Sequence, residues 1–109
     1  MSSSTRDSRF SQFVEFTVDP LHAQDLVTAL ITRVEQFTCF YPGFISVRVH
    51  SNQENERVLM QLLWISKEHG EHALELAQTV EPDLFHLARQ HHASALLFST
   101  YDAVAEVRV

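Results

Sequence analysis

The stretch RVLMQLLWI, residues 57–65, decides the fold because it carries apolar side chains on both of its faces. A run of this kind between polar turns predicts a strand, and side chains along a strand point alternately to its two sides. The two apolar sets are Val58, Met60, Leu62 and Trp64 on one side, and Leu59, Leu63 and Ile65 on the other. One layer of helices covers one face of a sheet, so a second covering is needed.

The rest of the chain predicts the order β-α-β-β-α-β, which is the ferredoxin-like α+β class with both helices on one face of an antiparallel sheet. Apolar periodicity and turn residues delimit the elements. The predicted strands are 10–18, 44–50, 57–65 and a last strand from about 94 to 109 with a bend near 101–102. The predicted helices run from 20 to about 37, from 67 to about 78 and, briefly, from about 82 to 92. Ile45, Val47 and Val49 are expected to share one face of the second strand, and Asp19 and Ser66 are the expected caps of the first two helices.

The uncovered face of this sheet predicts a homodimer. An apolar patch of several hundred Å² is more than monomers usually expose. A two-fold dimer that packs sheet against sheet covers it with a second copy of the same chain. The alternative is that the C-terminal stretch AVAEVRV, residues 103–109, folds back over the patch or reaches the partner's sheet.

Composition limits the class of protein. The 109 residues suffice for one domain, which we expect at 10–109 after a solvated tail at 1–9. The net charge of −6 and the lack of a basic cluster argue against nucleic-acid binding, and no apolar run is long enough to span a membrane. Cys39 is the only cysteine, so we expect a cytoplasmic protein in which Cys39 is a small buried apolar residue.

The stretches YPGFISVRVH, residues 41–50, and RVLMQLLWISKEH, residues 57–69, resemble the antibiotic biosynthesis monooxygenase family of small dimeric domains. The matching positions are Pro42, Gly43, Phe44, Ser46, His50, Trp64, Ser66 and Glu68. The resemblance implies oxygenation of a small aromatic or enolisable compound without a cofactor. In that reaction the phenolate or enolate of the substrate passes an electron to O₂.

The sequence departs from the best-studied members of that family, which pair the tryptophan with an asparagine four residues earlier and a tyrosine on the next helix. Met60 stands at the first position, and only Gly70 or His72 lies near the second. An alternative function is therefore a non-catalytic small-molecule-binding or dimerisation module. Haem binding or degradation is a third reading, weakened because FSQFVEFTV, residues 10–18, lacks the asparagine of the haem-degrading relatives.

The predicted catalytic residues are Trp64, His69 and His72. Trp64 would form the wall of a pocket, or alternatively only fill the core. His69 and His72 begin the next helix, and an imidazole titrates close to neutral pH, as a general base requires. A partly buried structural histidine is the alternative for each of them.

The predicted substrate-binding residues are Met60, Leu62, Arg89 and His91. Met60 and Leu62 share the strand face of Trp64, and His91 shares a helix face with Leu87. Arg89 could hold a carboxylate or phenolate of the substrate. No metal is expected, because the histidines form no HExxH motif and no Cys/His framework.

Overall fold

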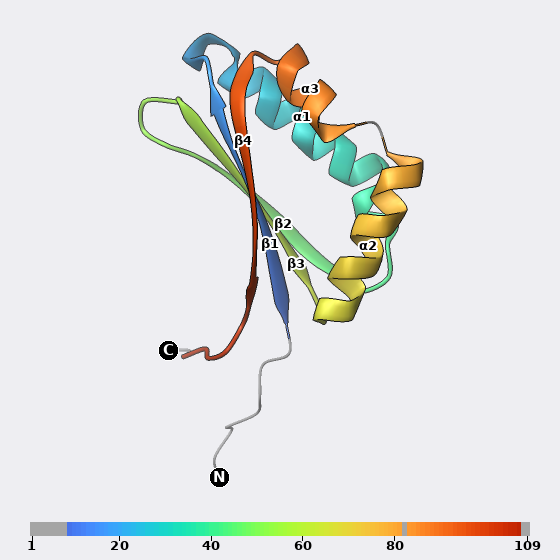
Figure 1. Ribbon diagram of the computed structural model, residues 1–109. Coiled ribbons are helices and arrows are strands. Elements are labelled where there is room, and N and C mark those ends of the chain that lie inside the picture. The colour runs from blue at the N-terminus through green and yellow to red at the C-terminus, as the bar shows by residue number, and fades with distance from the viewer. Residues whose placement is uncertain (1–8, 82, 108–109) are drawn as a thin grey trace.

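The computed structural model describes residues 9–81 and 83–107, and it has the predicted ferredoxin-like α+β fold. The elements are β1 (Phe10–Val18), the 3₁₀ turn η1 (Pro20–His22), α1 (Ala23–Gln36), the 3₁₀ turn η2 (Thr38–Phe40), β2 (Phe44–Ser51), β3 (Arg57–Trp64), α2 (Lys67–Val80), α3 (Leu84–Gln90) and β4 (Ala93–Asp102). The antiparallel sheet has the order β2-β3-β1-β4. All three α-helices lie on one side of it (Figure 1).

Side-chain caps determine where the helical segments begin. The carboxylate of Asp19 accepts the Leu21 N–H at 3.0 Å, and the hydroxyl of Ser66 accepts the His69 N–H at 3.2 Å, as the sequence predicted. The carboxylate of Asp83 accepts the Phe85 N–H at 3.0 Å and starts α3 at Leu84, later than the predicted start. Each cap satisfies an amide that has no partner within its helix.

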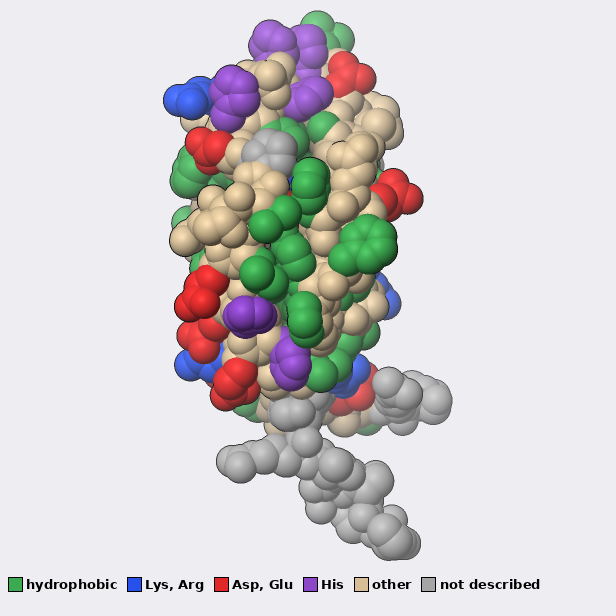
Figure 2. Space-filling model, turned by 90° about the vertical axis from the view of Figure 1, so that its right-hand side faces the viewer, with side chains coloured by type: hydrophobic (Ala, Val, Ile, Leu, Met, Phe, Trp, Pro, Cys, Tyr) green, Lys and Arg blue, Asp and Glu red, His purple; other side chains and the backbone are tan. Residues whose placement is uncertain are grey.

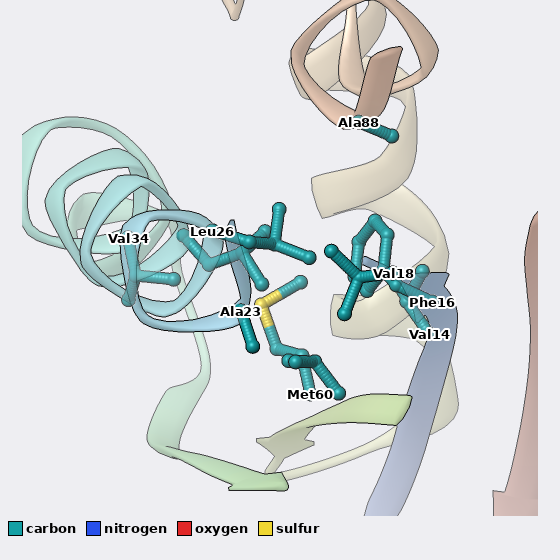
Figure 3. Packing of buried hydrophobic residues seen from close by; sticks show 10 residues of the cluster. Val14, Phe16, Val18, Ala23, Leu26, Val34, Met60 and Ala88 are labelled. Carbon is teal, nitrogen blue, oxygen red and sulfur yellow. The ribbon is translucent and has the colours of Figure 1, made fainter. Parts of the chain in front are cut away.

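The core lies between the helices and the inward face of the sheet. It contains Val14, Phe16, Val18, Ala23, Leu26, Leu30, Val34, Val58, Met60 and Ala88. Figure 3 shows Met60 reaching from the sheet between Ala23 and the side chains of β1. Of the two apolar sets on β3, the set with Met60 and Trp64 therefore faces the helices.

Three predictions about local structure were wrong. The register shifts between Phe44 and Ser46, so Ile45 does not share the inward face of Val47 and is exposed. Cys39 is exposed in η2 rather than buried, because its thiol points back to the carbonyl of Glu35. The last strand ends at Asp102, which pairs with the first residue of β1, Phe10, and among the described residues only the Ala103 N–H continues the pairing, to the Arg9 carbonyl at 3.0 Å.

The outward face of the sheet remains apolar and open. Leu97 and Tyr101 of β4 are 64% and 61% exposed, and they line a hollow of about 510 Å³ with Phe13 and Leu59. The segment 103–107 reaches only one end of this face, where the Arg9 guanidinium pairs with Glu106 at 2.9 Å. The rest of the predicted tail, residues 1–8, lies outside the described residues.

No helix in the described ranges has both the length and the apolar character needed to cross a bilayer.

Candidate functional site

Two cavities that share part of their lining lie on the helix side of the sheet. The inner chamber, of about 80 Å³, lies under α1 and α2 and is lined by side chains that include Val14, Val34, Met60, Leu62 and Trp64. The outer cleft, of about 610 Å³, lies where α2 and α3 meet β4. Figure 2 shows this side of the molecule, with hydrophobic side chains gathered along the groove between the helices.

Six residues line both cavities, and we call this shared lining the neck. Its members are Arg33, Leu74, Ala77, Glu81, Leu84 and Phe98, each of which lines both the inner chamber and the outer cleft. Four of them are apolar, whereas Arg33 and Glu81 are charged. These two charged side chains therefore border both the outer cleft and the inner chamber.

Trp64 is a fixed wall of the inner chamber. It is 1% exposed, and the Phe44 ring packs edge-on against it with ring centroids 5.6 Å apart. Its indole N–H donates to the side-chain oxygen of Gln12 at 2.9 Å, and the Gln12 amide nitrogen donates to the Gly70 carbonyl at 3.0 Å. These bonds satisfy the buried polar atoms and hold the ring in one orientation.

A buried polar cluster occupies the neck. Arg33 Nε pairs with Glu81 Oε1 at 2.8 Å, and the two side chains are 10% and 3% exposed. The Tyr41 hydroxyl, which lines the inner chamber, donates to Glu81 Oε2 at 2.5 Å. Burial raises the pKa of Tyr41 well above its ordinary value, and the hydrogen bond to the Glu81 carboxylate raises it further. Tyr41 is therefore a neutral donor at physiological pH.

The predicted catalytic histidines do not line either cavity. His69 is half-buried, its Nδ1 lies 2.6 Å from the Ser66 hydroxyl, and its ring lies against Gly43. The side chain of His72 is 58% exposed and faces Glu75 at 4.0 Å. Proton transfer by these two histidines stays a prediction.

The predicted substrate-binding residues separate into two pairs. Met60 and Leu62 line the inner chamber beside Trp64. Arg89 is exposed on α3 and His91 is half-buried at its end, and neither lines the chamber or the cleft. The structure thus brings three of the seven predicted site residues together: Trp64, Met60 and Leu62.

Four further residues of the site were missed in the sequence: Gln12, Arg33, Tyr41 and Glu81. Gln12 left a signal, because it is the one polar side chain among the inward positions of β1. The other three lie on α1, after η2 and at the end of α2, and only the packing of these elements brings them together.

The other histidines lie away from the cavities. The His22 and His92 rings stack with centroids 3.8 Å apart, which joins η1 to the start of β4. In Figure 2 the histidines gather toward the two ends of the groove rather than along it. Within the described ranges, no three His, Cys, Asp or Glu side chains converge as metal ligands would.

Solved structures of other proteins share this fold. The chain is similar to a monooxygenase from the gene ActVA-Orf6 of Streptomyces coelicolor, solved in complex with nanaomycin D, with 18% identity, a TM-score of 0.77 and 94% of each chain covered. It is also similar to a point mutant of SnoaB of Streptomyces nogalater, a cofactor-independent oxygenase, with 14% identity, a TM-score of 0.65 and 92% and 97% of the two chains covered.

A third similar structure is Rv0793 of Mycobacterium tuberculosis, with 12% identity, a TM-score of 0.67, 93% of this chain covered and 100% of the other. No curated protein sequence matches the chain. The sequence pattern of antibiotic biosynthesis monooxygenases matches residues 9–81, most of the chain and every element through α2. The chain therefore belongs to the antibiotic biosynthesis monooxygenase family.

Proposed function

We propose that the protein is a cofactor-independent monooxygenase that acts on a small aromatic or enolisable compound. Family membership and the likeness to oxygenase folds support a monooxygenase-type function. The observation that carries the proposal is the apolar cavity of two chambers with one buried polar cluster at the neck between them. Pockets of this kind, apolar with a few placed polar groups, are typical of small-molecule sites.

The reaction is the conversion of a CH₂ group beside an aromatic ring or carbonyl into a carbonyl, R₂CH₂ + O₂ → R₂C=O + H₂O. Loss of a proton gives the substrate anion, which passes one electron to O₂. The two radicals combine to a peroxide anion, which takes the proton back to give the hydroperoxide, and loss of water from the hydroperoxide leaves the ketone. The protein has to take up the first proton, hold the anion and keep bulk water out.

The sizes of the cavities support a different place for each reactant. A protein cavity that holds one benzene ring measures about 150 Å³. The inner chamber is smaller, at about 80 Å³, so the rings of the substrate occupy the outer cleft of about 610 Å³. The inner chamber, with its apolar walls, is left for O₂.

A second candidate function is a binding module without chemistry. Met60 and Gly70 favour it, because they stand where the resemblance expected an asparagine and a tyrosine. Such a module would bind the same aromatic compounds in the cleft and consume no oxygen.

We also propose that two copies of this single-domain protein pack through their open sheet faces. Members of the family are typically dimeric. The exposure of Leu97 and Tyr101, and the hollow they line with Phe13, support the same contact here. A cytoplasmic location is proposed on the single cysteine alone.

Oxygen consumption tests the function. The protein is incubated aerobically with anthrone, the keto tautomer of a reduced polycyclic phenol, and uptake is compared with buffer and with Trp64→Phe, His69→Ala, His72→Ala and His86→Ala. We expect uptake above buffer, lowered by Trp64→Phe because Trp64 walls the chamber, and unchanged by His86→Ala because His86 is exposed on α3. Loss of uptake in His69→Ala or His72→Ala would support those histidines as bases. Binding of anthrone without uptake would favour the binding module.

A further inference from the structure

We propose that Glu81 is the proton acceptor of this reaction, with Arg33 as the counter-ion of the substrate anion and Tyr41 as the residue that positions Glu81. The inference rests on the proposed function and deepens it. It assigns the proton transfer to Glu81, which the sequence did not indicate, in place of the two histidines that begin α2.

Glu81 lies where the proposed proton transfer would take place. The substrate rings occupy the outer cleft and O₂ the inner chamber, so the reacting carbon lies between them, at the neck. Glu81 and Arg33 are the two charged residues that line both cavities. A general base must lie within hydrogen-bond reach of the proton it removes, and among the described carboxylates Glu81 alone lines both cavities.

The proposed proton transfer does not alter the net charge at the neck. Before the transfer, the buried neck holds the Arg33 guanidinium, the Glu81 carboxylate and a neutral substrate. In the transfer the acidic C–H or O–H bond of the substrate breaks, an O–H bond forms on Glu81, and the electron pair stays on the substrate. The neck then holds the guanidinium, a neutral carboxylic acid and the substrate anion. The net charge is unchanged, so Arg33 exchanges one anionic partner for another and no uncompensated charge is buried.

Tyr41 acts through Glu81. Its hydroxyl donates to Glu81 Oε2 while Arg33 pairs with Glu81 Oε1, so both oxygens are held in place from two different elements. The raised pKa of Tyr41 keeps this hydroxyl protonated, so it does not compete for the substrate's proton. The other titratable group close to the path is Asp83, which lines the outer cleft and caps α3.

The same contacts also tie three elements together, so a test has to separate chemistry from folding. Glu81→Gln serves this purpose, because the amide oxygen can still accept from Tyr41 or Arg33 but the side chain no longer takes up a proton. Glu71→Gln is the matched control, since Glu71 is an exposed glutamate on α2 that lines neither cavity. Circular dichroism and the emission of Trp64, the chain's single tryptophan, report whether each variant keeps the native fold.

The first measurement is turnover. With anthrone and air we expect Glu81→Gln to lower kcat at least about 100-fold, the lower end of what a general base contributes. Quenching of Trp64 emission should show that anthrone binds the variant within about threefold of the wild-type affinity, and Glu71→Gln should match the wild type in both respects. Wild-type turnover retained by a folded Glu81→Gln variant would overturn the inference and leave the oxygenase function standing.

The second measurement is made without oxygen, so it does not depend on turnover. The anion of anthrone absorbs at longer wavelength than the neutral compound. We expect the anion band when anthrone binds the wild type or Glu71→Gln at pH 7, and no such band with Glu81→Gln. An anion band in the wild type without oxygen uptake in air would support Glu81 as the base and overturn the oxygenase function. The absence of the band in the wild type, or its persistence in Glu81→Gln, would overturn the role of Glu81.

Discussion

At the scale of single residues, the cavities on the helix side of the sheet are lined mainly by apolar side chains. The few buried polar side chains among them each have a hydrogen-bond partner. In the described residues, every buried side-chain nitrogen or oxygen has a hydrogen-bond partner. Gln12 connects Trp64 to the backbone of α2, and Glu81 connects Arg33 to Tyr41. Such fully satisfied polar groups specify one geometry in an otherwise apolar core.

Tyr41 makes the stability of the protein sensitive to alkaline pH. Its pKa is raised in the folded state, so the folded protein keeps the proton where the unfolded chain begins to lose it, above about pH 10. The stabilisation is complete below that pH and declines above it. We expect the free energy of unfolding to change little from this source up to about pH 10 and to fall as the pH rises further, and to fall less in Tyr41→Phe. Urea denaturation at three pH values measures the free energy of unfolding, and Tyr101→Phe, which alters an exposed tyrosine, is the control. An equal dependence of this free energy on pH in Tyr41→Phe and wild type would contradict the raised pKa of Tyr41.

Ala73 tests the assignment of the inner chamber to O₂. It is buried and lines that chamber but not the outer cleft. Ala73→Val adds two methyl groups to the chamber, so we expect a higher KM for O₂ with an unchanged affinity for anthrone. Oxygen-dependent initial rates and Trp64 quenching give the two values. A weaker affinity for anthrone at an unchanged KM for O₂ would place the substrate, not O₂, in the chamber.

The sequence predicted one wall of the site and missed its charged centre. Trp64, Met60 and Leu62 follow from alternation along a single strand, which is a local pattern. Arg33, Tyr41 and Glu81 come from three segments, and no periodicity in any one segment shows that the three meet. The clustering of histidines in the sequence led to the prediction of His69 and His72 as catalytic residues. In the structure the histidines lie toward the two ends of the groove.

At the scale of elements, the strands and helices agree with their sequence signals because caps, turns and apolar periodicity point the same way. β1 and the caps of η1 and α2 are as predicted. The prediction was wrong at Ile45, where a register shift beside Gly43 changes which side chains face inward. Gly43 has a φ of +83°, a conformation that favours glycine, and the turn it forms lies against His69.

Gly70 lies inside α2, where glycine lowers the helix propensity but close packing leaves no room for a larger side chain. A Cβ at this position would lie 2.6 Å from Phe10 Cδ2, because α2 approaches β1 most closely there. We expect Gly70→Ala to destabilise the protein by about 1–3 kcal/mol through overpacking, despite the helix propensity of alanine. It should also lengthen the hydrogen bond from Gln12 and so shift the Trp64 emission. Urea denaturation measures the change, with Thr79→Ala, an exposed position of α2, as the control; a stabilised Gly70→Ala variant would contradict this packing.

At the scale of the whole molecule, the apolar side chains on the two faces of β3 take part in different contacts. The inward face builds the core and the inner chamber, and the outward face contributes Leu59 and Leu63 to an open apolar surface. Segment 103–107 reaches one end of that surface and leaves Leu97 and Tyr101 exposed. The proposed dimer would bury the remainder without disturbing the cavities, because the helices that line them lie on the opposite side of the sheet (Figure 1).

A charge on the open face tests the dimer. Leu97 lies outward on β4, so Leu97→Glu would place a carboxylate within the contact while leaving the core of each subunit intact. We expect the wild type to elute as a dimer at micromolar concentration and the variant as a folded monomer, measured by size exclusion with light scattering. Leu21→Glu, at an exposed position in η1, is the control and should stay dimeric. A monomeric wild type would contradict the proposed contact.

The fate of the oxygen atoms tests the central claim, that the cavity beneath the helices supports direct reaction of a substrate anion with O₂. Anthrone is incubated with the protein under ¹⁸O₂ in ordinary water, and the product is analysed by mass spectrometry. We predict a product that has gained one ¹⁸O atom, formed faster than in buffer, with the second ¹⁸O released as water. A product whose new oxygen comes from the solvent, or a rate equal to that in buffer, would contradict the account.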